Sequence, residues 1–272
     1  MSSIDPPQPT RLSPRRVRQP FSSWRAVFAL TLREMSTSYG RSPGGYLWAI
    51  LEPAGGIALM TLIFSVGFRN PPLGADFALF YAGGILPFFF YNDIAMKMGQ
   101  VVQSNRALLE YPRVTFVDAL LARLLLNALT QLMVVAVVLS FLTTITSEET
   151  VFDLGKMTLA LTMLIVLAAG VGTANAYLIV AFPIWATAWS VMNRPLFLIS
   201  GIFFLIEAIP EPYQAWLLWN PLVHPIGLMR DAMYPYYQPA YVSELYVFAV
   251  GALLMVAGLF LLNRYHRDLL TK

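Results

Sequence analysis

Long runs of apolar residues dominate the chain from residue 46 onward, and shorter polar connections separate them. Six of these runs approach the roughly 20 residues that a helix needs to cross the hydrocarbon core of a membrane. Their approximate bounds are 46–68, 77–98, 116–143, 156–182, 188–206 and 243–262. The third and fourth runs exceed what a hydrocarbon thickness of about 30 Å requires, so we expect them to tilt or protrude. The pattern predicts an all-α membrane protein whose six transmembrane helices lie within residues 46–264.

A different pattern precedes the first span. Between residues 21 and 40, apolar side chains recur at steps of three or four, which places them on one face of a helix. Arg33, Glu34 and Thr37 point away from that face. A helix with aromatic anchors on one side and charge on the other is expected to lie in the membrane interface. The anchors are Phe21, Trp24, Phe28, Leu32, Met35 and Tyr39.

Composition excludes a soluble protein with a single membrane anchor. The chain is 57% hydrophobic and 12% charged, whereas soluble domains carry about 25% charged residues. Residues 1–20 are rich in proline and arginine and contain no apolar core, so we expect a disordered basic cytoplasmic tail there. The remaining alternative for residues 21–40, a soluble amphipathic helix packed on a hairpin, does not fit the long apolar runs that follow.

Charge distribution predicts the orientation. Of the 18 lysines and arginines, 15 lie before the first span, in the second-to-third and fourth-to-fifth connections, and in the C-terminal tail. The other three are Arg69, Lys156 and Arg230. Since basic residues concentrate on the cytoplasmic side, both termini are expected to be cytoplasmic.

Two connections are more than turns. On the expected cytoplasmic side, residues 103–113 are polar, and residues 105–110 could form a short helix that Pro112 ends. This segment is either a solvated loop or a docking helix for a cytoplasmic partner. On the outer side, residues 207–239 contain too many prolines to span, yet they are rich in apolar residues, which favours a re-entrant or interfacial helix pair.

Catalytic and metal-binding signals are absent from the sequence. Gly155 and Lys156 lack the remaining residues of a nucleotide-binding loop, and the chain has no cysteine. Its two histidines, His224 and His266, lie far apart in the sequence, so a metal site or histidine catalysis is not expected. A secondary transporter would need ionisable residues near the membrane midplane, and a membrane-embedded glycan-processing enzyme would need clustered carboxylates or histidine. The spans show neither pattern.

Aromatic residues are abundant in and near the second and fifth spans. Lipid-facing belts need tryptophan and tyrosine near the interfaces, whereas a carbohydrate pathway needs flat aromatic faces on which sugars stack. The sequence leaves both interpretations open. The candidate channel residues are Phe88, Phe89, Tyr91, Trp185, Trp189 and Phe203.

Four stretches of the chain are similar to a known family. LREMSTSYGRSPGGYLWAILEP (32–53), GGILPFFFYND (83–93), NRALLEYPRVTFVDALLAR (105–123) and LLWNPLVHPIGLMRDAM (217–233) resemble ABC-2 type polysaccharide exporter permeases. The resemblance is closest to the KpsM-type capsular polysaccharide export permease of Gram-negative bacteria. It covers the chain in order, apart from the proline-rich first 20 residues.

The resemblance implies a homodimer of six-span subunits docked to a separate cytoplasmic ATPase, which binds ATP and Mg²⁺. No cofactor is expected in this chain itself. The dimer would export a lipid-linked polysaccharide across the bacterial inner membrane, working with a periplasmic co-polymerase or adaptor and an outer-membrane exporter. A permease for O-antigen or teichoic acid is the nearest alternative. Residues 212–231 match the family's re-entrant outer helices.

Three groups of site residues follow from the resemblance and from the residue chemistry. The expected ATPase-coupling residues are Asn105, Arg106, Leu108, Leu109, Tyr111 and Pro112. Arg33, Arg41 and Glu52 are candidates for substrate entry, since arginine forks suit phosphate or acidic sugars; ordinary headgroup contacts are the alternative. Trp216 and Trp219 would share one face of a helix that Asn220 and Pro221 end, with a second helix over residues 223–233. This pair could close the channel from outside.

Overall fold

The structure is a computed structural model that describes residues 22–38, 44–109, 115–146 and 151–271. These residues form helices and connections, with no β-strand among them. The predicted tail (1–20), the turn at 41–43 and the expected site residues Arg41, Tyr111 and Pro112 lie outside the described residues.

Among the described residues, five helices are long and apolar enough to cross a membrane. They are α2 (Gly45–Gly67), α3 (Phe77–Gly99), α6 (Phe116–Ile145), α7 (Leu154–Ala181) and α11 (Glu244–Thr271). Their bounds agree closely with four of the six predicted spans, and α11 begins as predicted but continues nine residues beyond the predicted end at 262. Side chains in the sequence determine where several begin: Asp76 and Asp153 accept hydrogen bonds from the first turns of α3 and α7, and Thr115 forms a capping box with Asp118 at the start of α6.

The predicted span over residues 188–206 takes a different form. Its helix, α8 (Trp185–Ile199), has 15 residues, which gives a length of only about 22 Å at 1.5 Å per residue. The apolar sequence continues to residue 206, but the backbone leaves the helix at Ser200 and Gly201 adopts a positive φ of 77°. A sixth transmembrane helix is therefore not confirmed. The short helix η1 (Ile206–Ala208) follows.

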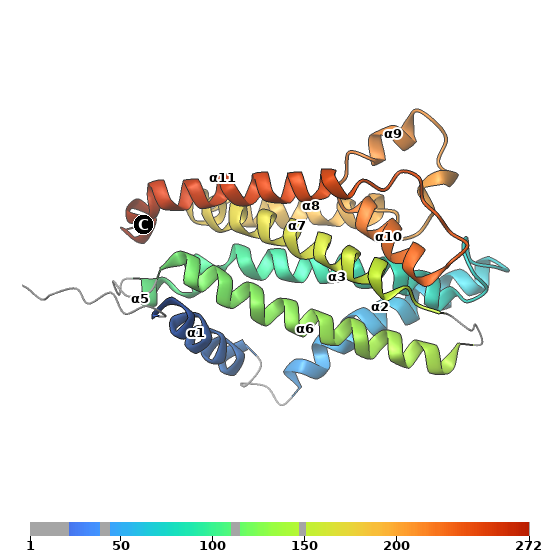
Figure 1. The fold of residues 1–272 in the computed structure, drawn as a ribbon, viewed down its shortest axis with the longest axis horizontal. Coiled ribbons are helices and arrows are strands. Elements are labelled where there is room, and N and C mark those ends of the chain that lie inside the picture. The colour runs from blue at the N-terminus through green and yellow to red at the C-terminus, as the bar shows by residue number, and fades with distance from the viewer. Residues whose placement is uncertain (1–21, 39–43, 110–114, 147–150, 272) are drawn as a thin grey trace, which may run out of the picture.

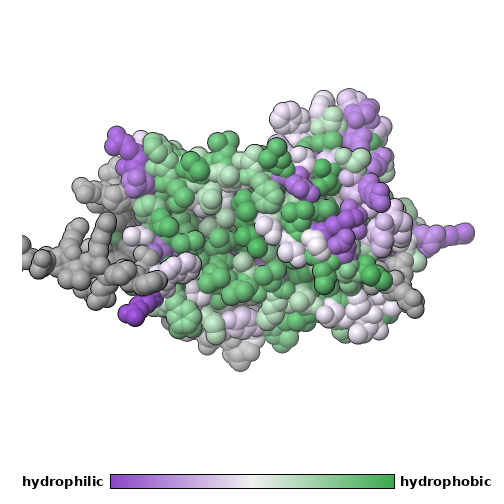
Figure 2. All heavy atoms as spheres, in the orientation of Figure 1, coloured by the Kyte–Doolittle hydropathy of each residue, from purple (hydrophilic) through white to green (hydrophobic). Residues whose placement is uncertain are grey.

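The remaining helices are short and gather at the two ends of the bundle. Figure 1 shows α1 (Ser22–Ser38), α5 (Arg106–Leu109) and the C-terminal end of α11 at one end, and α9 (Tyr213–Leu217) and α10 (Val223–Met233) at the other. The helix α4 (Val101–Ser104) continues from α3 toward α5. The second helix predicted over residues 223–233 is confirmed. Figure 2 shows hydrophobic residues gathered over the middle of the molecule and hydrophilic residues at both ends.

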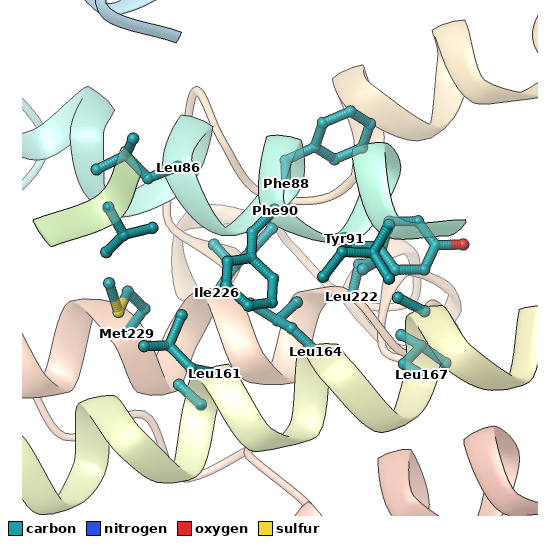
Figure 3. Packing of buried hydrophobic residues seen from close by; sticks show 14 of the residues in the cluster. Leu86, Phe88, Phe90, Tyr91, Leu161, Leu164, Leu167, Leu222, Ile226 and Met229 are labelled. Carbon is teal, nitrogen blue, oxygen red and sulfur yellow. The ribbon is translucent and has the colours of Figure 1, made fainter. Parts of the chain in front are cut away.

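The core lies where α3, α6, α7, α10 and α11 meet. Phe90 and Tyr91 are buried on the side of α3 that faces α7, near Leu164 and Leu167, and Phe88 points to the other side (Figure 3). Helices α7 and α11 approach so closely that a Cβ added at Gly170 would collide with the Gly251 carbonyl oxygen. Gly170 is therefore a small-residue packing position between the two helices.

Candidate functional site

A buried ion pair joins the N-terminal helix to the bundle. Glu34 on α1 is 4% exposed, and the Arg123 guanidinium on α6 donates to both of its carboxylate oxygens, with Nε–Oε2 at 2.6 Å and Nη2–Oε1 at 2.7 Å. This bidentate ion pair fixes both the position and the orientation of α1 against α6. As predicted, Glu34 points away from the aromatic face of α1, but it points into the protein rather than into water.

Asn105 links this ion pair to the connection between α4 and α5. Its amide nitrogen donates to Glu34 Oε1 at 3.0 Å, and its amide oxygen accepts from Arg33 Nη1 at 3.0 Å. Asn105 is 3% exposed, so it contacts this chain and offers little surface to a partner. The structure thus joins Arg33, predicted for substrate entry, to Asn105, predicted for ATPase coupling, within one polar network.

Arg123 extends the network to the ends of α3 and α4. It donates to the Lys97 carbonyl oxygen at 3.0 Å and to Ser104 Oγ at 2.8 Å. One guanidinium therefore holds α1, α3, α4 and α6 together. We call Arg33, Glu34, Ser104, Asn105 and Arg123 the junction network. Removing one partner of such a buried pair leaves an uncompensated charge, which makes the junction sensitive to single substitutions.

The opposite faces of α1 have separate roles. Val27 and Leu30 are buried against Ala122 of α6, with Leu108 packed beside them. The predicted anchors within the described part of the helix stay exposed: Trp24, Phe28, Leu32 and Met35. This arrangement is the one expected of a helix that presents aromatic and aliphatic side chains to a membrane surface.

The other expected coupling residues that the structure describes lie in α5. Leu108 and Leu109 are half-buried, and Leu109 packs against the main core. Arg106 is exposed. Because Leu109 packs within its own chain, a charged substitution there would disturb the fold as well as any partner contact. The entry candidate Glu52 is exposed on α2.

The channel candidates fall into three surroundings. Phe88, Phe89 and Phe203 gather around Phe197, with ring centroids 5.0, 6.5 and 5.3 Å from it. Tyr91 is 3% exposed within the core, so it lines no open path in this chain. Trp185 and Trp189 stack on α8 with their centroids 6.4 Å apart. No separate sequence pattern pointed to Phe197, the residue that joins the first group.

At the end of the bundle that carries α9 and α10, Trp216 and Trp219 are 68% and 76% exposed. The predicted helix that would carry both is shorter than expected: α9 ends at Leu217, before Trp219. The predicted break is present, since the Asn220 side chain accepts a hydrogen bond from the Leu222 backbone N–H at 3.1 Å. Within this chain, the two indoles close no channel.

A fully buried arginine lies at the end of the bundle that carries α9 and α10. Arg230 on α10 is 1% exposed, and its guanidinium donates to the carbonyl oxygens of Gly201, Ile202 and Phe204 at 2.6, 2.8 and 3.1 Å. It also lies 4.3 Å from the centre of the Phe80 ring. These contacts fix the chain just beyond α8 against α10 and α3.

Comparison with known proteins assigns the chain to a family. Residues 25–234 match the model of the ABC-2 type transporter family, which covers α1 and α2 through α10. The chain belongs to the ABC-2 type transporter family.

Named relatives of this ABC-2 protein cover most of its length. The Polysialic acid transport protein KpsM of Escherichia coli is 31% identical over 245 residues, 90% of this chain and 95% of the relative. The Capsule polysaccharide export inner-membrane protein CtrC of Neisseria meningitidis is 24% identical, and BexB of Haemophilus influenzae is 23% identical. Each of these two alignments covers 89% of this chain and 92% of the relative.

Sequence reasoning missed the residues that hold this ABC-2 protein together at its two ends. Glu34, Arg123 and Arg230 each looked like an ordinary charge beside an apolar run. The available signal was position: Arg123 lies two turns inside a predicted span, and Arg230 lies within an apolar segment on the side where basic residues are scarce. A charge in such a place needs a partner.

Proposed function

We propose that this chain is the membrane-spanning subunit of an ABC exporter that carries lipid-linked capsular polysaccharide across the bacterial inner membrane. The observation that carries the proposal is the near full-length similarity to KpsM, CtrC and BexB, whose names describe polysialic acid transport or capsule polysaccharide export. A separate cytoplasmic ATPase would bind ATP and Mg²⁺ and supply the work, because the sequence contains no nucleotide-binding loop.

The proposed arrangement has α8 as a sixth membrane segment and both termini in the cytoplasm. In support, the segments assigned to the cytoplasmic side from their charge, α1, α5 and the end of α11, gather at one end of the bundle, and α9 and α10 lie at the other (Figure 1). A homodimer is proposed because α2 exposes most of its apolar surface, and open space surrounds a Cβ added at Gly55. A periplasmic adaptor and an outer-membrane exporter complete the proposed assembly.

Coupling is proposed to run through the junction network. The ATPase would contact α5 near Arg106, and movement of the segment 101–109 would reach α1 through Asn105, Arg33 and Glu34. The interfacial helix and the coupling segment would then move together. A role of Arg33 in binding the phosphate or acidic sugars of the substrate is compatible with its bond to Asn105, since a guanidinium has five N–H donors.

The exporter itself is tested by deletion and complementation. Deleting the gene should abolish surface capsule while lipid-linked polysaccharide accumulates inside the cell, and the tagged chain should copurify with an ATPase. A deletion strain with normal capsule would refute the proposal. If O-antigen or teichoic acid is lost instead of capsule, the family assignment stands and the substrate assignment fails.

The coupling route is tested by Asn105→Leu. Export should fall strongly while ATP hydrolysis by the purified complex continues, because the link between the coupling segment and α1 is cut. The matched control is Asn127→Leu, since Asn127 is also a buried asparagine but its amide bonds the Arg123 carbonyl oxygen within α6. Equal export by the two variants would contradict the coupling route.

A further inference from the structure

Two adjoining cavities form a groove at the end of the bundle that carries α1 and α5. The smaller has a volume of about 80 Å³ and the larger about 380 Å³. Both are lined by Gln103 and Ile179, so they meet between the segment 95–106 and the C-terminal part of α7. The start of α8 closes the smaller cavity, which has Trp189 and Ser190 in its wall. The larger cavity falls within the range of about 300–1,000 Å³ that small-ligand sites occupy.

Asn175 places an unsatisfied donor at this groove. The residue is 2% exposed, and its Oδ1 accepts a hydrogen bond from Trp185 Nε1 at 2.9 Å. Its Nδ2 has no hydrogen-bond partner among the described residues, although Asn175 lines the smaller cavity. Buried amide donors are nearly always paired, so this one points to a ligand that supplies an acceptor.

The face of α8 that bears Trp185 carries two further side chains with unsatisfied polar atoms. Within the described part of the chain, Trp189 Nε1 and both amide atoms of Asn193 are buried without a partner. Trp185, Trp189 and Asn193 recur at intervals of four residues, so they share the face of α8 that bears the contact to Asn175. Polar groups therefore follow one line from the groove into the otherwise apolar bundle.

The chemistry of the groove suits a carbohydrate. Its polar lining consists of amides, one hydroxyl, one indole and one guanidinium; the residues are Gln100, Gln103, Arg106, Asn175, Trp189 and Ser190. Amides donate and accept, which matches sugar hydroxyls that do the same, and an indole face suits the C–H face of a sugar ring. We propose that this groove binds a short segment of the exported sugar chain itself, recognised through its hydroxyl groups. The inference rests on the proposed function.

The position of the groove gives this binding a consequence. Gln100, Gln103 and Arg106 belong to the connection from α3 to α5, and Asn105 of the junction network lies between the last two. A sugar chain in the groove would therefore contact residues of the segment 101–109, through which the ATPase is proposed to act. Substrate bound in the groove would thus affect the coupling segment 101–109 directly. This contact would be made before the glycan reaches the aromatic residues around Phe197.

The chain has no native cysteine, which allows a direct test. A Gln103→Cys variant is purified with its ATPase in lipid nanodiscs and labelled with a water-soluble maleimide. The probe is a set of lipid-free oligosaccharides cut from the capsule of the producing bacterium. We expect the probe to slow labelling at position 103. Labelling of Ser36→Cys, at an exposed site on α1, should stay unchanged.

Second variants then identify the groups that bind. Adding Asn175→Leu or Trp189→Phe to Gln103→Cys should raise the oligosaccharide concentration needed for protection by up to about tenfold, the effect of losing one buried hydrogen bond. The matched control is Thr173→Val on the same helix, because the Thr173 hydroxyl bonds the Ala169 carbonyl oxygen within α7. It should leave protection unchanged and shows whether a buried substitution alone disturbs α7.

Several outcomes would overturn the inference. If saturating oligosaccharide does not slow labelling at position 103, the groove holds water or nothing. Protection by the lipid-linked glycan but not by lipid-free oligosaccharides would assign the site to the lipid. If Asn175→Leu instead dissociates a dimer, the amide pairs with a second copy of the chain. Loss of capsule in the deletion strain combined with an unprotected Gln103→Cys would refute this inference and leave the proposed function intact.

Discussion

Arg123, whose side chain is 12% exposed, and Arg230, which is 1% exposed, lie at opposite ends of the bundle and stabilise their surroundings in different ways. Arg123 pairs with the carboxylate of Glu34, a side chain 89 residues away. Arg230 bonds three backbone carbonyl oxygens just beyond the C-terminal end of α8, where carbonyl groups lack helical partners. The first arrangement depends on two replaceable side chains, and the second depends on one side chain and the course of the backbone.

This difference indicates which end of the bundle is suited to conformational change. A link between two side chains can open and close without altering either helix, as a junction between moving parts requires. A guanidinium that satisfies three carbonyls cannot leave without exposing all of them, so we expect the region around Arg230 to stay fixed. The comparison makes four predictions, given in order of decreasing effect on stability.

The largest effect is expected from Glu34→Ala. It leaves the Arg123 guanidinium buried without its carboxylate, which should weaken the attachment of α1 to α6 by about 3–5 kcal/mol. Hydrogen exchange of the α1 amides and the unfolding temperature in nanodiscs measure this loss. The double variant Glu34→Leu with Arg123→Leu should recover much of it, because no buried charge remains; a double variant as unstable as the single one would contradict this account.

Arg230→Lys should cost about 2 kcal/mol, since an ammonium group cannot reach all three carbonyls with the geometry of the guanidinium fork. The unfolding temperature measures it, and hydrogen exchange should increase around residues 201–204. No second substitution of a side chain should restore the loss, because the partners are backbone atoms. A lysine variant with wild-type stability would remove the contrast with Arg123.

A smaller effect is expected at His224 on α10. Burial lowers its pKa below the ordinary value of 6.5, its Nδ1 accepts from the Ser243 backbone N–H at 3.2 Å, and the rings of Tyr241 and Tyr246 lie against it. The neutral form is thus favoured in the fold. Stability from this group is fully present above pH 6.5 and is lost as the pH falls from 6.5 toward the lowered pKa.

Unfolding temperatures measured across this pH range test the prediction. The wild-type protein should lose stability below pH 6.5 more steeply than His224→Gln, which keeps polar character without titrating. Parallel pH profiles for the two proteins would show that protonation of His224 does not affect the stability of the region around α10.

The smallest change in stability is expected from the double variant Trp216→Ala with Trp219→Ala. Both indoles are largely exposed, so the unfolding temperature should change little, corresponding to within about 0.5 kcal/mol per site. If the two indoles close the channel in the assembled exporter, proteoliposomes carrying the double variant should leak protons without ATP. An impermeable membrane would exclude a gate at this position.

The helices of this fold could be predicted well from the sequence, and their polar contacts could not. Hydropathy placed α3, α6 and α7 within about two residues of their observed ends, because this signal is local along the chain. The Asp93–Lys97 pair, at 2.9 Å, is also a local contact, since side chains four residues apart on a helix lie next to each other. The Glu34–Arg123 pair depends on how α1 packs against α6, which no local pattern shows.

The extent of α8 shows a second limit. The apolar run over 188–206 predicted one continuous span, yet the helix ends at Ile199 because the chain turns at Gly201. Hydropathy reports which residues avoid water and does not report where the backbone bends. The carbonyls freed by that bend are the ones that Arg230 binds, so the missed helix end and the missed arginine have the same origin.

The glycine contact between α7 and α11 determines which parts of the molecule are stiff. At Gly170 and Gly251 the two backbones meet with no side chain between them. Neither helix can therefore slide or rotate without opening a void or causing a steric clash. We expect α7 and α11 to move as one rigid body. Displacements during transport then fall on α2 and α8, which have few buried residues within this chain.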